Sequence, residues 1–179
     1  MKGSDPLIYF KEQRLVIRSM VKDDIEKIVD GFAAQHWSKR IEMFEDYYMR
    51  QLKKEHQVFV ALLNEEVAGF VLLTPKAIAG PFAQMDIPEI VDLNVFKKYQ
   101  HQGIGNALMD VAERAACEFA SIVCLAIGLH ASFGAAQRLY VKRGYIPDGS
   151  GVWYRGLPLD QYAQCINDDD LMLHLSKSL

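Results

Sequence analysis

The chain has 179 residues, half of them apolar and 24% charged, with a formal net charge of −3 at pH 7. These values are typical of one globular domain with a single core, and we expect one domain over residues 1–179. The sequence has no strongly basic stretch, which argues against a nucleic-acid partner. No apolar run is long enough to cross a membrane, and Met1–Pro6 lack the pattern of a secretory signal. We therefore expect a cytoplasmic protein without a membrane partner.

The cysteines and histidines show no pattern of a disulfide framework or a metal site. The three cysteines, Cys117, Cys124 and Cys165, are odd in number and form no C-x-x-C motif. The five histidines are scattered and lack metal-ligand spacing. We expect a reduced compartment, Cys117 and Cys124 as small packing residues, and no metal.

The N-terminal half predicts a strand, two helices and a β-hairpin. The strand covers residues 14–18, a helix with one apolar face follows it, and a second helix starts near Lys39. Residues 58–63 and 67–73 are apolar runs separated by a short turn, which favours a hairpin. Because these runs are continuous, we expect both faces of the sheet to be covered. Residues 74–88 contain three prolines and a glycine and predict a loop.

A strand, a glycine-bearing turn and a helix occupy the centre of the chain, from Glu89 to Phe119. The apolar run Glu89–Phe96 predicts the strand, in which Glu89, Val91, Leu93 and Val95 alternate with Asp92 and Asn94. Apolar residues from Ile104 to Phe119 recur at the three-to-four spacing of a buried helix face. At the helix start, Gly103 and Gly105 lack a Cβ and let a ligand approach the backbone. The first helical N–H groups have no internal partner and attract anions, so this turn is a candidate phosphate site.

The C-terminal part predicts three more strand segments and a helix. Residues 122–127 form a buried strand, and a helix capped by Ser132 runs to Gly144, which suits a left-handed C-cap. Strands follow near residues 145–154 and 171–175. The element order favours an α+β or mixed fold, because adjacent strands are too many for a doubly wound parallel sheet.

Two motifs carry a resemblance to a known family. Gln100-His101-Gln102-Gly103-Ile104-Gly105 resembles the Q/R-x-x-G-x-G/A signature of the GNAT superfamily of acetyl-CoA-dependent N-acetyltransferases. The segment Ala136–Tyr145 resembles the A-x-x-L-Y-x-K-x-G-F/Y signature of the same family. Together they imply a GNAT-like α+β fold, with a mixed, largely antiparallel sheet of about six to seven strands and about four helices on both faces.

The resemblance also implies a coenzyme A site. The loop amides would hold the pyrophosphate, and the backbone of the central strand would pair with the pantetheine and acetyl group. The residues implied are Leu93, Asn94, Val95, Gln100, His101, Gln102, Gly103, Ile104, Gly105, Asn106 and Ala107. One departure concerns the arm of the cofactor, because Phe133 stands where many members have a pantetheine-binding Asn. Ser132 could replace that Asn in part.

Two residues are candidates for proton transfer. Tyr140, in the second motif, would face the sulfur by resemblance; a phenol with a pKa near ~10 stays protonated and can donate to a leaving thiolate with a pKa near ~8.5. Glu89 is the candidate base, because burial raises the pKa of a carboxyl group toward useful values. The alternatives are a packing role for Tyr140, and a solvent-facing Glu89 with a water chain as the base.

The sequence therefore predicts an acetyl-CoA-dependent N-acetyltransferase that acts on a primary amine of a small molecule or peptide by direct attack. One alternative is a non-catalytic acyl-CoA-binding or regulatory module of the same fold. Another is a nucleotide-binding α/β domain, although Leu108 stands where the G-x-G-x-x-G pattern needs its third glycine and no Gly-Lys-Ser/Thr occurs. The acceptor cannot be read from these motifs, and the family resemblance allows a homodimer.

Overall fold

A computed structural model describes residues 5–179, so the predictions for residues 1–4 lie outside it. The chain groups into two compact units. The first comprises the described residues up to Thr74 together with Asp92–Ala115, and the second comprises Pro75–Val91 together with Ala116–Leu179. None of the helices among residues 5–179 is long and apolar enough to cross a membrane. The expectation of one domain over residues 1–179 stays a prediction.

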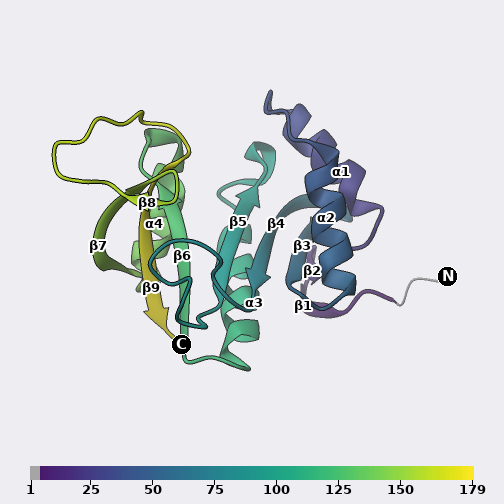
Figure 1. Ribbon diagram of the computed structural model, residues 1–179. Coiled ribbons are helices and arrows are strands. Elements are labelled where there is room, and N and C mark those ends of the chain that lie inside the picture. The colour runs from purple at the N-terminus through teal and green to yellow at the C-terminus, as the bar shows by residue number, and fades with distance from the viewer. Residues whose placement is uncertain (1–4) are drawn as a thin grey trace. The chain divides into compact units, whose positions relative to one another are not determined.

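The first unit is built on consecutive antiparallel strands. They are β1 (Ile8–Glu12), β2 (Leu15–Ser19), β3 (Gln57–Leu63) and β4 (Glu66–Thr74), and the Asp92–Val95 end of β5 (Glu89–Val95) lies beside β4. Helices α1 (Asp24–Ala33) and α2 (Ile41–Leu52) lie on one face, and α3 (Ile104–Cys117) lies on the other (Figure 1). Val67 to Leu73 are all buried, which confirms the predicted covering of both sheet faces.

Aromatic rings form the core between α1, α2 and β4. The ring of Phe32 lies 5.9 Å from that of Phe44, 6.1 Å from that of Phe70 and 5.3 Å from that of Phe96. A Cβ on Gly31 would lie 2.4 Å from the Phe96 ring, so only glycine allows this packing. The residue that begins the site loop, Phe96, is thereby fixed by the core.

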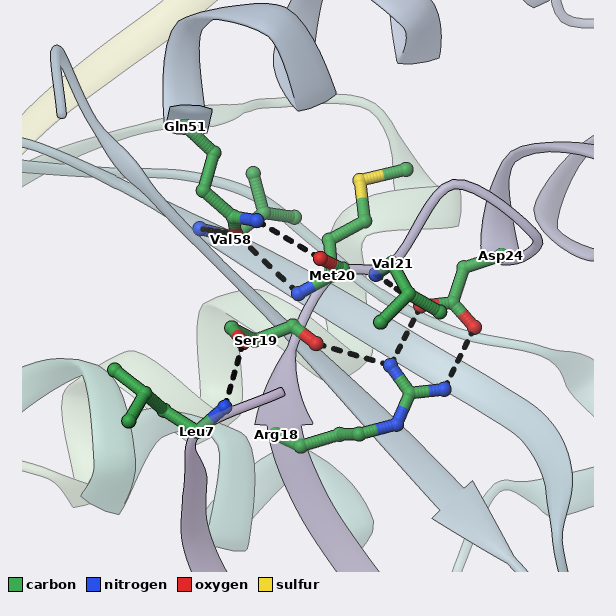
Figure 2. A network of polar contacts seen from close by, with 8 residues as sticks. All are labelled: Leu7, Arg18, Ser19, Met20, Val21, Asp24, Gln51 and Val58. Atoms are coloured by element: carbon green, nitrogen blue, oxygen red, sulfur yellow. Dashed lines mark hydrogen bonds and ion pairs between the residues drawn. The ribbon is translucent and has the colours of Figure 1, made fainter. Parts of the chain in front are cut away.

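A polar network joins the end of β2 to helices α1 and α2 (Figure 2). The Arg18 guanidinium donates two hydrogen bonds to the fully buried Asp24 carboxylate, at 2.7 and 2.8 Å. The Val21 amide donates a third, at 2.8 Å. The side-chain amide of Gln51 donates to the Met20 carbonyl at 2.8 Å, and its oxygen accepts from the Val58 amide at 3.2 Å. These bonds satisfy the buried charge and the backbone where the chain leaves β2.

The second unit contains the remaining strands. Glu89 of β5 pairs in parallel with Cys124 of β6 (Ile122–Gly128), and β6 pairs antiparallel with β9 (Leu171–Ser178). Beyond β9 come β7 (Ile146–Tyr154) and β8 (Leu157–Pro158), both antiparallel to their neighbours. Helix α4 (Gly134–Lys142) follows β6 after the short 3₁₀ turn η2 (Ala131–Phe133).

The predicted class is confirmed: four α-helices and a mixed, largely antiparallel set of nine strands are described in residues 5–179.

Some local predictions differ from the structure. The sequence analysis did not predict β1 or the two-residue β8. Phe119 was predicted on the buried face of α3, but it is 51% exposed because the helix ends at Cys117. The predicted cap at Ser132 is wrong. Its hydroxyl lies 2.8 Å from Nδ1 of His130, and η2 precedes the helix.

Candidate functional site

In the first unit, the loop between β5 and α3 is held by contacts on its N-terminal side. The 3₁₀ turn η1 (Lys97–Tyr99) buries Tyr99, whose hydroxyl donates to the Glu66 carboxylate. The side-chain amide of Gln100 donates to the Val95 carbonyl at 2.9 Å. The Gln100 side chain therefore ties the loop to the end of β5.

The turn itself has left-handed backbone at two positions. His101 has φ 61° and Gly103 has φ 80°. A Cβ on Gly103 would meet no atom within 4 Å, so its backbone angle, not crowding, favours glycine there. Gln102 and Gly103 are exposed, which leaves the turn open to a ligand.

Helix α3 starts directly after this turn. The Ala107 amide donates a hydrogen bond to the Gly103 carbonyl at 3.0 Å, and this bond closes the first turn of the helix. The amides of Ile104 and Gly105 precede it and have no acceptor within the helix. The first turn carries no acidic residue, and Ile104 is 1% exposed and anchors the helix start. The dipole and the unpaired N–H groups make this end suitable for an anion.

The strand before the loop is irregular at Asp92, which has φ 51°. This left-handed residue interrupts the regular alternation predicted for Glu89–Val95. The Tyr47 hydroxyl donates to Oδ2 of Asp92 at 2.5 Å, and the Asn94 side-chain amide donates to the Asp92 carbonyl at 3.1 Å. Burial, followed by the Asp92 charge, raises the pKa of Tyr47, so its hydroxyl keeps the proton and remains a donor.

Strand β4 approaches β5 closely at Gly69. A Cβ there would lie 2.3 Å from the Asn94 carbonyl oxygen, and the Phe96 amide donates to the Ala68 carbonyl at 2.9 Å. The Leu93–Val95 backbone is thus supported by β4 as well as by Tyr47.

In the second unit, Glu89 lies beside Cys124. Burial raises the pKa of Glu89 to about 7. Burial and the charge of Glu89 raise the pKa of the Cys124 thiol to about 12. Cys124 is 1% exposed and packs with Ala77 and Phe82, as predicted for a packing cysteine rather than a thiolate nucleophile.

Tyr140 is buried on α4 and is 6% exposed. Its ring lies 5.8 Å from that of Tyr145, and its carbonyl accepts the Tyr145 amide at 3.0 Å. Gly144, with φ 86°, ends the helix in the left-handed conformation predicted for it.

Glu89 and Tyr140, the two candidate proton-transfer residues, lie toward opposite faces of the sheet formed by the second unit's strands. Paired residues point to the same face, and successive residues alternate. Glu89 therefore shares a face with Cys124 and its partner Ser176. Lys177 faces the other way, and its amine lies 5.7 Å from the centre of the Tyr145 ring, which packs on Tyr140.

Phe133 occupies the space at the end of β6. A Cβ on Gly128 would lie 2.3 Å from the Phe133 ring, and the Gln137 side-chain amide donates to the Gly128 carbonyl at 2.8 Å. Nearby, His130 links Ser132 at one ring nitrogen to Asp169 at the other, both at 2.8 Å. The turn therefore carries a phenyl ring and a His–Asp pair, whereas the motif has a pantetheine-binding Asn at the Phe133 position in many members of the family.

Sequence reasoning did not find the Tyr47–Asp92 and His130–Asp169 contacts. Their partners lie 45 and 39 residues apart, and no local pattern links them.

Comparisons with known proteins agree with this geometry. The model of the acetyltransferase (GNAT) domain matches residues 54–147, just over half of the chain, and the chain therefore belongs to the GNAT acetyltransferase family. No curated protein sequence matches it.

Solved structures share the fold at low sequence identity. A GNAT-family protein from Desulfovibrio desulfuricans has a TM-score of 0.69 at 13% identity, covering 92% of this chain and 98% of that one. The yncA protein of Salmonella typhimurium, solved with acetyl-CoA, has a TM-score of 0.65 at 16% identity, covering 93% and 94%. The ribosomal-protein-S18-alanine N-acetyltransferase of Escherichia coli has a TM-score of 0.65 at 16% identity, covering 92% and 93%.

Proposed function

We propose that this protein is an acetyl-CoA-dependent N-acetyltransferase that transfers the acetyl group to a primary amine by direct attack in a ternary complex. The observation that carries the proposal is the open turn at Gly103, which leads into the start of α3 in a chain of the GNAT family. The acceptor is the amine of a small molecule or a peptide. The family membership and the largely antiparallel strands argue against the nucleotide-binding α/β alternative.

The coenzyme A end of the site is assigned to the first unit. The backbone amides from Gln102 to Ala107 bind the pyrophosphate, supported by the positive end of α3. Gln100 and His101 shape the turn, because one bonds the Val95 carbonyl and the other has left-handed backbone. Leu93, Asn94 and Val95 offer backbone groups to the pantetheine and the thioester. The bound acetyl-CoA supplies the acetyl group.

Two side chains of the second unit handle protons in this proposal. Glu89 accepts a proton from the attacking ammonium, which has a pKa near ~10 and must become neutral before it can attack. The raised pKa of Glu89, about 7, suits a base that works near neutral pH. Tyr140 donates to the leaving sulfur.

We also propose that the protein acts in the cytoplasm as one domain. The three cysteines are free, and Cys117 and Cys165 are exposed, which suits a reducing compartment. A homodimer, without nucleic-acid or membrane partners, is part of the same proposal.

The test uses the full chain in two assays. Binding of acetyl-CoA is measured calorimetrically, with NAD and ATP as competitors, and thiol release is followed across a panel of primary amines. We expect binding that coenzyme A displaces and NAD and ATP do not, and thiol release that depends on an amine. Binding without amine-dependent release would instead identify a non-catalytic acyl-CoA-binding module. Failure to bind coenzyme A would overturn the proposal.

A further inference from the structure

A second polar cluster lies in the second unit around His174 of β9, which is 6% exposed. Its ring packs in edge-to-face geometry against two aromatic rings. The ring centroids are 6.5 Å apart for Phe82 and 5.2 Å apart for Trp153. A Cβ on Gly80 would lie 2.3 Å from its Cε1 atom, so the loop backbone also covers the ring. The cluster therefore lies under the loop that precedes β5.

Asp148 brings a negative charge to this cluster. It follows Pro147, which pairs with Leu175, at the start of the register shift between Pro147 and Val152, and its charge acts on His174. Burial lowers the pKa of His174, and the nearby Asp148 charge opposes that shift. The net effect favours the neutral form of His174, which brings no positive charge to Asp148.

One oxygen of that carboxylate is buried and unpaired. Among residues 5–179, no group donates a hydrogen bond to Oδ1 of Asp148. The nearby Trp153 indole N–H donates to the Ser150 hydroxyl at 2.7 Å instead. Lys177 is directed to the opposite face, where it lies over Tyr145. A buried, unpaired carboxylate oxygen costs free energy unless a donor arrives from elsewhere.

The cluster shares its sheet face with the proposed base. His174 pairs with Ala126, which is two residues from Cys124, the partner of Glu89. Trp153 pairs with Met172, two residues from His174, and so points to the same face. Phe82 supports this placement independently, because it packs with both Cys124 and His174. Three strand spacings separate β5 from β7, and His174 lies two residues along β9 from the level of Glu89, which together put Asp148 about 16 Å from Glu89 across the sheet.

We propose that Asp148, with the rings of Trp153 and Phe82, binds a second ammonium group of the acceptor, which is a linear polyamine. This inference rests on the proposed transferase function and names its substrate class. One ammonium pairs with the Asp148 carboxylate between aromatic rings, and a second amine about 16 Å away reaches Glu89. A linear aliphatic chain can carry two amines at that spacing.

The binding test uses the intrinsic fluorescence of the cluster itself. The chain has two tryptophans, so Trp37→Phe leaves Trp153 as the single reporter. Spermine and a series of α,ω-diaminoalkanes are titrated into this variant without acetyl-CoA, against 1-aminoalkanes of matched length. We expect Trp153 fluorescence to change with the diamines, and affinity to rise with length to an optimum that the monoamines lack. Equal affinities for monoamines and diamines at every length would overturn the proposal. This test needs no substitution of Asp148.

Substitution then tests the carboxylate. Asp148→Asn removes the charge, and Asp160→Asn removes the charge of an exposed aspartate in the same unit. We expect at least tenfold weaker spermine binding for the first variant and unchanged binding for the second. An unchanged affinity in a folded Asp148→Asn protein would refute the site.

Thiol release separates this inference from the proposed function. Transfer to monoamines as efficient as transfer to diamines would keep the transferase and reject the polyamine subsite. Asp148-dependent diamine binding without thiol release would keep the subsite and reject the transferase.

Discussion

The hydroxyl of Tyr47 on α2 donates a 2.5 Å hydrogen bond to Oδ2 of Asp92, a residue of β5 held at φ 51°. A left-handed aspartate inside a strand costs free energy, and this bond together with the Asn94 contact offsets the cost. Helix α2 thereby supports the strand whose next residues are proposed to bind the pantetheine arm.

Tyr47→Phe should weaken acetyl-CoA binding about three- to tenfold, because the Leu93–Val95 backbone loses its support. The unfolding free energy should fall by about 1–3 kcal/mol, the cost of leaving the Asp92 carboxylate without its donor. Calorimetry and urea denaturation measure the two effects. Tyr48→Phe, the neighbouring tyrosine on α2, is the control and should change neither; equal effects of the two variants would contradict the role of Tyr47.

Gly103→Ala should reduce acetyl-CoA affinity through the shape of the turn. Both Gly103 and Gly144 have left-handed backbone, with φ 80° and 86°, and a Cβ on either would meet no atom within 4 Å. Each alanine should therefore cost a similar ~1–2 kcal/mol of stability. Only Gly103→Ala should weaken acetyl-CoA binding in calorimetry, and a matching loss in Gly144→Ala would show that the effect is general destabilisation.

Glu89 should give the pH–rate profile an acidic limb near pH 7. The base acts when it is ionised, so kcat/KM should fall as the pH drops through the raised pKa of about 7. Glu89→Gln should lower turnover and remove this limb. If the limb persists in the variant, another residue or a water chain is the base.

The same carboxyl group should also affect stability with pH. Its folded-state pKa, about 7, exceeds the unfolded value near ~4.3, so the folded state favours the protonated form. Its contribution is complete below pH ~4 and is lost as the pH rises toward 7 and above. Glu89→Gln should therefore gain stability relative to the unaltered protein on going from pH 5 to pH 8, as measured by urea denaturation. A constant difference between these pH values would contradict the raised pKa.

Tyr140→Phe should lower kcat at least about tenfold, since a positioned general acid contributes on that scale or above. The Kd for coenzyme A should stay unchanged, because the ring and its contact with Tyr145 are retained. Tyr145→Phe is the matched control and should keep normal turnover. Full turnover in Tyr140→Phe would leave that residue with a packing role alone.

Asp24→Asn should destabilise the fold by about 3–5 kcal/mol, because it leaves Arg18 without its carboxylate partner in a buried site. Asp23→Asn changes an exposed neighbour and should shift the denaturation midpoint little. Similar midpoints for the two variants would show that the ion pair adds nothing to the stability of the first unit.

The sequence predicted those features that depend on nearby residues. The α+β class, the β3–β4 hairpin, helix α3 and the turn at Gly103 follow from periodicity and glycine placement within short segments. The two motifs likewise predicted the GNAT family, which the match over residues 54–147 confirms. Ser132 was misassigned because a serine before a helix favours a cap, whereas here its hydroxyl contacts His130. Phe119 was misplaced because apolar spacing continues past the point where α3 ends.

The tertiary structure alone decided which distant side chains meet. Tyr47 reaches Asp92, and Asp148 lies near His174, because strand pairing and helix packing bring these segments together. Register also associated Glu89 and Tyr140 with opposite faces, and it left Oδ1 of Asp148 buried without a donor. Hydrophobic periodicity specifies each element and its buried side, but side-chain partners between strands depend on a register that many long-range contacts set together.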